Sequence, residues 1–199
     1  MTDGVAVRNA ASLILCRQGP AGAQVLMGQR GSAAVFMPSK YVFPGGAVDA
    51  GDQSSGHLTA DCNRRLSLHC AAPAPSPEAL AGCVLREVVE ETGLAMLPSA
   101  PLRFVFRAIT PPGAPRRFDA RFFLADAAQV AGDPDDFSAA TDELSHLHWI
   151  GLSEARRLDL PFITEVILSE IAALIGGLAQ PGVPFFDNSG SVPTFRRLI

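Results

Sequence analysis

The sequence predicts a single α/β domain, and three observations lead to this prediction. The chain of 199 residues is long enough to bury one sizeable core. Apolar runs typical of strands stand on both sides of one central helical segment, and a second helical segment follows late in the chain. No internal repeat is visible. We expect strands near residues 5–16, 24–30, 102–109, 116–124 and 144–150, and helices near 77–92, 153–158 and 161–177.

The N-terminal part of the chain predicts a hairpin. Residues 5–16 are mostly apolar, as in a buried strand, and Gly19-Pro20-Ala21-Gly22 is typical of a turn. The second strand ends at Arg30, where an arginine either meets a phosphate or lies in solvent. A glycine-rich turn, Pro44-Gly45-Gly46, comes next, and its glycines allow the backbone to approach a ligand closely.

The central helix carries its own start and stop signals. Ser76 is a typical N-cap, Pro77 suits the first helical position, and Gly93 favours the end of the helix. Within it, residues 81, 85, 88 and 89 are apolar and are expected to face the core. The helix should therefore cover residues 77–92.

Three carboxylates share the opposite face of this helix. Glu87, Glu90 and Glu91 stand at i, i+3 and i+4, and Arg86 lies four residues before Glu90, within pairing distance. Clustered carboxylates repel one another unless a cation lies among them, which is the logic of a hard-metal site. We expect this acidic face to be exposed to solvent.

The second half of the chain offers fewer signals. Arg116 and Arg117 open a strand beside a proline-rich loop, where they either grip a phosphate or are solvated. Glu143 precedes the strand at residues 144–150. The late helix ends at Gly176-Gly177. The tail from Pro181 onward is predicted to be irregular but packed down through its phenylalanines.

Together, the glycine-rich turn and the acidic helix resemble the box of the Nudix hydrolases, in which a Gly-rich loop and an acidic residue precede Arg-Glu-x-x-Glu-Glu-x-Gly on a helix. The matching residues are Gly46, Arg86, Glu87, Glu90, Glu91 and Gly93. The resemblance covers about residues 5–178. It implies an α/β/α sandwich with a mixed sheet, here as one domain spanning residues 1–199.

The box departs from the family pattern at its first acidic residue. That residue normally follows the glycine by six positions and precedes the arginine by eight, which gives Asp52 by the first count and Glu78 by the second. An insertion at about 53–76 therefore splits the box. We prefer Glu78, which also fits an acid at the positive end of the helix, a capping role that would explain it without catalysis. The stiff, Pro-rich residues 71–77 lead us to expect the insertion at the active-site rim, contacting a leaving group or a second subunit.

The resemblance also implies a reaction, the hydrolysis of a pyrophosphate linkage between a nucleoside and another group. Mg²⁺ or Mn²⁺ would be held by Glu87, Glu90, Glu91 and the Gly45 carbonyl. Arg86 would hold the glutamates in place, and the general base would be Glu90 or, as second choice, Glu143. Phosphate contacts would come from Arg30, Gly46, Arg116 and Arg117.

The split box and the strand at residues 116–124 look most like the branch that contains coenzyme A diphosphatases, so coenzyme A or acyl-coenzyme A is the first substrate to consider. A second motif common in those enzymes is absent, since Val35 and Ser39 stand where an arginine and a glycine would be. A nucleotide-sugar or dinucleotide pyrophosphatase is the alternative. A non-catalytic ligand-binding domain is a third reading, but such domains often lose box glutamates.

Composition limits the partners. The net charge of −4 argues against a nucleic-acid partner, since such proteins are usually basic. No stretch is long and uncharged enough to span a membrane, because the most apolar helical segment carries Glu165 and Glu170. Charged residues near the N-terminus interrupt any signal-peptide pattern, so we expect a cytoplasmic protein with a small-molecule nucleoside diphosphate derivative as its partner. The sequence leaves open whether the protein forms a homodimer.

Overall fold

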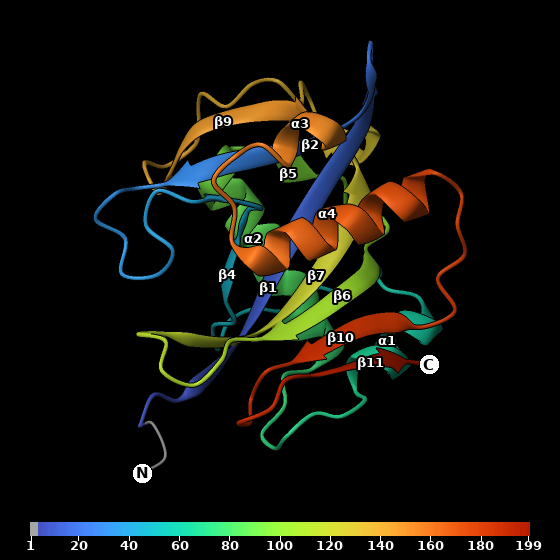
Figure 1. The fold of residues 1–199 in the computed structure, drawn as a ribbon. Coiled ribbons are helices and arrows are strands. Elements are labelled where there is room, and N and C mark those ends of the chain that lie inside the picture. Colours follow the sequence, from blue (N-terminus) through green and yellow to red (C-terminus); the bar gives the residue numbers. More distant parts are fainter. Residues whose placement is uncertain (1–3) are drawn as a thin grey trace.

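The computed structural model of the chain describes residues 4–199. Within that range, nine strands form one mixed sheet in the order β11-β10-β6-β7-β1-β2-β3, with β4 paired to β1 and β9 paired to β2 (Figure 1). β1 runs parallel to β7 and β6 runs parallel to β10, whereas the other pairs are antiparallel. A small second sheet joins β5 to β8.

The strands, in chain order, are β1 (Val7–Gly19), β2 (Gly22–Arg30), β3 (Tyr41–Val42), β4 (Gly45–Ala47), β5 (Ala95–Met96), β6 (Arg103–Ile109), β7 (Arg117–Asp126), β8 (Val130–Ala131), β9 (Leu144–Gly151), β10 (Val183–Asp187) and β11 (Thr194–Leu198). The helices are α1 (Ala60–Leu66), α2 (Pro77–Thr92), α3 (Leu152–Ala155) and α4 (Phe162–Ile175), with a 3-10 turn η1 at Ala127–Gln129. No helix in the described part of the chain has the length and apolar character needed to cross a bilayer.

The sheet separates two hydrophobic cores. Leu13 and Leu15 of β1 belong to the core beneath α2, whereas Ile14 belongs to the core beneath α4. This split follows from the two-residue period of a strand, which sends successive side chains to opposite faces. α2 and α4 therefore cover opposite faces of the sheet, as Figure 1 shows, and the predicted α/β sandwich with a mixed sheet is confirmed.

The central helix has the predicted bounds. The Ser76 hydroxyl accepts a hydrogen bond from the Ala79 amide at 3.0 Å, and Pro77 is the first helical residue. Gly93 ends the helix with φ of 76°, a left-handed conformation that glycine adopts without steric penalty. One prediction about its inner face was wrong, because Val89 is 45% exposed. The buried stripe runs through Leu80, Val84 and Val88, and one further residue turns the side chain about 100° away from it.

The tail is not irregular. Residues 183–187 and 194–198 form a hairpin, β10 and β11, and β10 extends the sheet beside β6. Phe185 is fully buried, Phe186 is half-buried, and Phe195 is 56% exposed, so the three phenylalanines do not all pack down. Without the tail, β6 would be an edge strand with unpaired backbone groups, and the pairing of β10 with those groups orders a segment whose own sequence signals are weak.

The insertion is part of the core rather than a projection from it. Leu66 of α1 is buried in the α2-side core, and His57 is 7% exposed with its ring hydrogen-bonded to the Ala100 carbonyl at 2.8 Å. The guanidinium of Arg107, on β6, donates to the Leu68 carbonyl at 2.8 Å. The insertion therefore closes the far end of the α2 side of the sheet.

Replacing Phe185 by alanine should destabilise the protein, because its ring is 1% exposed and packs under the Arg107 guanidinium at 4.3 Å. We expect a loss of about 3–5 kcal/mol in the free energy of unfolding, the usual range for a buried phenylalanine. Phe195→Ala, in the partner strand, is the matched control and should cost less than about 1 kcal/mol. Urea unfolding of both variants measures this. Equal losses in the free energy of unfolding would show that Phe185 does not anchor the tail hairpin to the core.

Candidate active site

Arg86 organises the acidic face of α2. One terminal nitrogen of its guanidinium, Nη1, donates to Glu87 at 2.8 Å and to Glu90 at 3.1 Å, and the other, Nη2, donates to the Ala47 carbonyl at 3.1 Å. The same side chain makes a two-pronged ion pair with Asp52, with Nε–Oδ1 of 2.8 Å and Nη2–Oδ2 of 3.0 Å. Arg86 thus ties the glycine-rich turn and the loop after it to the acidic helix.

Asp52 is the carboxylate that meets Arg86, and Glu78 is not. Asp52 is 5% exposed, and its hydrogen bonds with Arg86 hold the pKa of its carboxyl below the usual range. Glu78 lies in the first turn of α2, eight residues before Arg86, or about 12 Å along the helix axis. In the described range its carbonyl accepts from the Ser54 amide, but its side chain makes no hydrogen bond. The geometry therefore reverses our preference for Glu78.

Two glycines let the turn lie directly against the acidic helix. The Gly45 amide donates to Glu91 Oε2 at 2.7 Å. A Cβ on Gly46 would lie 2.2 Å from Glu87 Oε1, and a Cβ on Gly45 would lie 2.4 Å from the Ala11 carbonyl oxygen. No side chain fits at either position without moving strand β1 or Glu87. The Pro44-Gly45-Gly46 turn is thus shaped by contact with its neighbours.

Glu87 and Glu91 are buried, contrary to the expectation of a solvent-exposed acidic face. Glu91 is 1% exposed and Glu87 is 8% exposed, because both continue the inner stripe of α2. Burial raises the pKa of Glu91 to about 8, with Glu87 and Glu143 adding to the rise and the Gly45 amide opposing it. Burial also raises the pKa of Glu87, against the opposing effect of Arg86. Only Glu90 of the three lies exposed.

Glu143 and Arg30 complete the acidic end of the site from distant parts of the sequence. Arg30 ends β2, Glu143 precedes β9, and these two strands are paired. Arg30 Nη2 lies 3.5 Å from Glu143 Oε1, and its Nε donates to the Phe36 carbonyl at 3.1 Å. Glu143 is also close enough to Glu87 and Glu91 to raise the pKa of both carboxyls.

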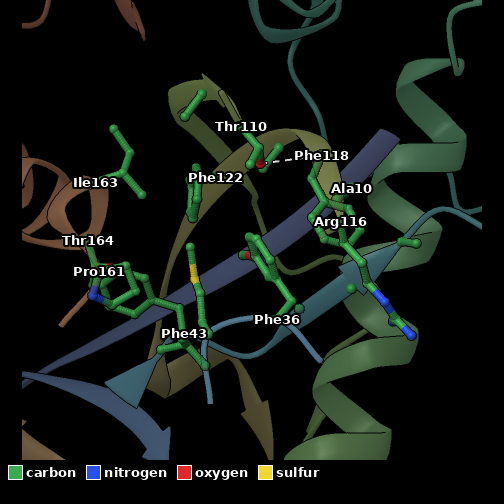
Figure 2. Close-up of a pocket in the computed structure, with 18 of the residues that line it drawn as sticks. Ala10, Phe36, Phe43, Thr110, Arg116, Phe118, Phe122, Pro161, Ile163 and Thr164 are labelled. Carbon is green, nitrogen blue, oxygen red and sulfur yellow. Dashed lines mark hydrogen bonds between the residues drawn. The ribbon is translucent and has the colours of Figure 1, made fainter. Parts of the chain in front are cut away.

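A cavity of about 540 Å³ opens from this acidic end, as large as typical small-molecule sites. Figure 2 shows it reaching across the sheet, with Arg116 on the side of α2 and Pro161 and Ile163 on the side of α4. Glu87, Glu90, Glu143 and Arg30 line its acidic end.

The two neighbouring arginines at the start of β7 separate. Arg116 is exposed and lines the cavity. Arg117 is 8% exposed and donates to the carbonyls of Thr110, at 3.2 Å, and Ser189, at 3.3 Å. Arg117 therefore holds the tail loop, because successive residues of a strand point to opposite faces.

The donor set fits a hard divalent cation. Three carboxylates and the Gly45 carbonyl are the oxygen ligands that Mg²⁺ and Mn²⁺ prefer. Burial, with neighbouring carboxylates adding to it, raises the pKa of Glu87 and of Glu91, and a bound cation would oppose both effects. As the side chains stand among residues 4–199, no three carboxylate, imidazole or thiol groups converge on one point. Arg86 engages Glu87 and Glu90, while Gly45 engages Glu91.

The insertion does not reach this cavity. All of the lining residues in the described chain come from outside residues 53–76. The cavity lining therefore gives no support to a contact between the insertion and a leaving group, because the apolar side chains of the insertion cover the α2-side core instead, and a contact with a second subunit stays a prediction.

Several cavity residues were missed in the sequence. Arg8, Ala10 and Ser12 alternate along β1 and face the cavity, and Phe36 packs edge-on against Phe118 with ring centroids 5.1 Å apart. The alternation in β1 was a usable signal, hidden within a strand that is apolar overall. Phe36 lies in the loop between β2 and β3, where no periodicity identifies a facing side chain.

The chain is similar to known Nudix hydrolases in sequence. No protein-family model matches it. A Caenorhabditis elegans protein named nudix hydrolase 7 is 29% identical over 157 residues, which cover 72% of this chain and 51% of that protein. The chain thus spans about half the length of this curated relative.

Solved structures agree in fold. A NUDIX hydrolase from Alicyclobacillus acidocaldarius superposes with a TM-score of 0.61 and 24% identity, covering 88% of this chain and 98% of that one. The NUDIX domain of Shewanella oneidensis NrtR, solved with ADP ribose, superposes with a TM-score of 0.58 and 15% identity, covering 85% of this chain and 89% of that one. A C. elegans Ap4A hydrolase complex superposes with a TM-score of 0.54 and 17% identity, covering 86% of this chain and 100% of that one. The chain therefore has the fold of these Nudix hydrolase structures.

Proposed function

We propose that the chain is a divalent-metal-dependent hydrolase of the pyrophosphate linkage in a nucleoside diphosphate joined to another group. One observation carries the proposal. The carboxylates of Glu87 and Glu91 lie against the Gly45-Gly46 turn, and Glu87 and Glu90 line one end of a ligand-sized cavity. Oxygen donors, a close backbone approach and room for a small molecule therefore meet at one place.

The substrate class is supported by the neighbours. One similar fold was solved with ADP ribose and another is an Ap4A hydrolase, and both ligands named there contain a nucleoside joined through phosphoric anhydrides. Coenzyme A or acyl-coenzyme A is the finer candidate that the split box suggests. Nucleotide sugars and dinucleotides are the alternatives within the same reaction class.

Each residue has a role that follows from its contacts. Arg86, fixed by Asp52, orients Glu87 and Glu90 and so acts as a positioning residue. Arg30 and Arg116 line the cavity and would contact phosphate oxygens, whereas Arg117 is engaged with backbone carbonyls. Gly46 has no side chain, which lets the Glu87 carboxylate lie directly against the turn.

The general base is best assigned to Glu143. Glu87, Glu90 and Glu91 would hold Mg²⁺ or Mn²⁺, and the bound cation supplies positive charge that polarises the diphosphate and makes a neighbouring water more acidic. A carboxylate outside that donor set then takes the proton from the attacking water. Glu143 lines the cavity, and its side chain is 55% exposed and only loosely paired with Arg30. Glu90, our first choice from sequence, is held by Arg86 at 3.1 Å.

A non-catalytic binding domain is the alternative from another class. All three helix carboxylates are present, and two of them, Glu87 and Glu90, line the cavity, which favours the enzyme. The two are distinguished by incubating the protein with ADP ribose, diadenosine tetraphosphate and coenzyme A, with and without Mg²⁺, and measuring the released adenine nucleotides by chromatography. Binding without release from any of them would favour the non-catalytic domain.

Activity should require the cation and Glu91. EDTA should abolish nucleotide release and Mg²⁺ or Mn²⁺ should restore it. Glu91→Gln should lower turnover by about 10²-fold or more and weaken Mn²⁺ binding measured by calorimetry. The amide oxygen of glutamine can still accept from the Gly45 amide, so the fold should survive. Glu165→Gln, on the exposed face of α4, is the control and should change neither. Near-normal turnover of Glu91→Gln would remove Glu91 from the donor set.

Asp52→Asn should reduce both turnover and stability more than Glu78→Gln. Loss of the carboxylate leaves Arg86 underpaired, at a cost of about 1–3 kcal/mol, whereas losing a helix-end acid costs about 0.3–1 kcal/mol. Because the folded pKa of Asp52 is lowered, its stabilisation is complete above the unfolded value of about 3.9 and is lost as the pH falls through the folded value. The stability gap between wild type and Asp52→Asn should therefore shrink below about pH 4. Thermal melts across pH test this, and a gap that widens in acid would contradict it.

Glu143→Gln should separate proton transfer from metal binding. We expect kcat to fall by about 10²–10⁴-fold and the acidic limb of its pH profile to flatten, because the group that must be ionised is gone. Mn²⁺ affinity should stay near that of the wild type. Glu90→Gln should instead lower kcat and Mn²⁺ affinity together. The assignment fails if the Glu143→Gln enzyme keeps the wild-type pH profile.

A further inference from the structure

A row of four alanines crosses the sheet at the floor of the cavity. Ala10 of β1 pairs with Ala47 of β4 on one side and with Ala120 of β7 on the other, and Ala120 pairs with Ala108 of β6. Directly paired residues point to the same face of a sheet, and all four line the cavity. We name this row the alanine trough.

Larger side chains form the walls of the trough. Phe118 and Phe122 flank Ala120 two residues away on β7, so they rise from the same face on either side of the alanines. The far end is closed by Phe186 of β10, which pairs with Ala108 and packs against Phe162 with ring centroids 6.4 Å apart. Figure 2 shows Phe118 and Phe122 on the two sides of this space.

The trough begins at the acidic end of the site. Ala47 directly follows Gly46, which lies against the Glu87 carboxylate, so a diphosphate held at that carboxylate would place its next group on the alanines. From Ala47 to Ala108 the trough crosses three strand spacings, or about 14 Å at about 4.8 Å each.

The floor of the trough is apolar. It consists of methyl groups, with the rings of Phe118, Phe122 and Phe186 beside it and at its end, whereas Arg8, Ser12 and Asn188 add polar groups around it and the Thr110 hydroxyl already accepts from the Phe118 amide at 3.1 Å. Amide or base-edge groups laid on the methyl floor itself would lose hydrogen bonds to water without replacement from the floor, which is costly. A hydrocarbon chain gains free energy from the same burial.

We propose that the alanine trough binds a hydrocarbon chain attached directly to the diphosphate, so the substrate's second group is an alkyl or prenyl chain rather than the amide-bearing arm of coenzyme A. The inference rests on the proposed function, in that the diphosphate is placed at the Glu87 end. It adds the chemical class of the group that lies on the other side of the scissile linkage.

The test is a series of adenosine diphosphate alkyl esters with methyl, butyl, octyl and dodecyl chains. For the wild type, kcat/KM should rise by roughly threefold to fourfold per methylene and then level off once the trough is filled. Non-hydrolysable methylene-bisphosphonate analogues of the same esters, titrated by calorimetry with Mg²⁺ present, should show the same dependence in affinity. The calorimetric series needs no turnover.

Two variants locate the chain in the trough. Ala120→Leu blocks the middle of the trough and Ala108→Leu blocks its far end. The rise of kcat/KM with chain length should therefore stop at a shorter chain in Ala120→Leu than in Ala108→Leu. In both variants the loss of kcat/KM relative to the wild type should grow with chain length and be smallest for the methyl ester. Ala23→Leu, a half-buried strand alanine outside the cavity, is the control and should leave the whole series unchanged. Thermal melts establish that each variant is folded.

The outcomes separate the two proposals. A flat series with normal hydrolysis of the methyl ester overturns the trough assignment and leaves the proposed function intact. Analogue affinity that rises with chain length, without hydrolysis of any ester, supports the trough and overturns the hydrolase. Should Ala120→Leu weaken the methyl ester as much as the octyl ester, the nucleoside occupies the trough and the inference fails.

Discussion

The site depends on one guanidinium that holds four negatively charged or polar groups around it. Arg86 contacts Asp52 on the loop, Glu87 and Glu90 on α2, and the Ala47 carbonyl on β4. Without that charge, carboxylates gathered at the edge of a buried helix face would repel one another and the glycine-rich turn would lose its anchor. The pKa of Arg86 is raised by these partners, Asp52 first, so the cation persists at every working pH.

The sequence predicted those parts of the site whose geometry is local. Residues three and four apart on a helix share a face, so the spacing of Arg86, Glu87 and Glu90 was enough to place them together. The capping residues Ser76 and Gly93 defined the helix ends for the same reason. Local periodicity could not predict how deeply each side chain is buried. Glu91 follows the apolar stripe and is buried, because tertiary packing decides how far a helix rotates into the core.

Contacts between distant segments were harder to predict. The choice between Asp52 and Glu78 depended on how the chain returns to α2 after the insertion, and two spacing rules gave two answers. Strand pairing brings Glu143 beside Arg30, and β10 beside β6, across large sequence separations. Register of this kind is set by burial of whole faces rather than by any one residue. The tail and the insertion were misjudged for that reason.

The two faces of the sheet are used differently, and this division explains both the core and the cavity. On the α2 side, large residues such as Leu13, Phe104 and Phe123 pack tightly, and the insertion extends that core. On the α4 side, the same strands present small side chains near β4, so less apolar surface is buried there. Since α4 covers only part of that face, the remaining space lies next to the glutamates. A sheet that filled this face with larger side chains would gain stability but would have no room beside the acidic helix for a ligand.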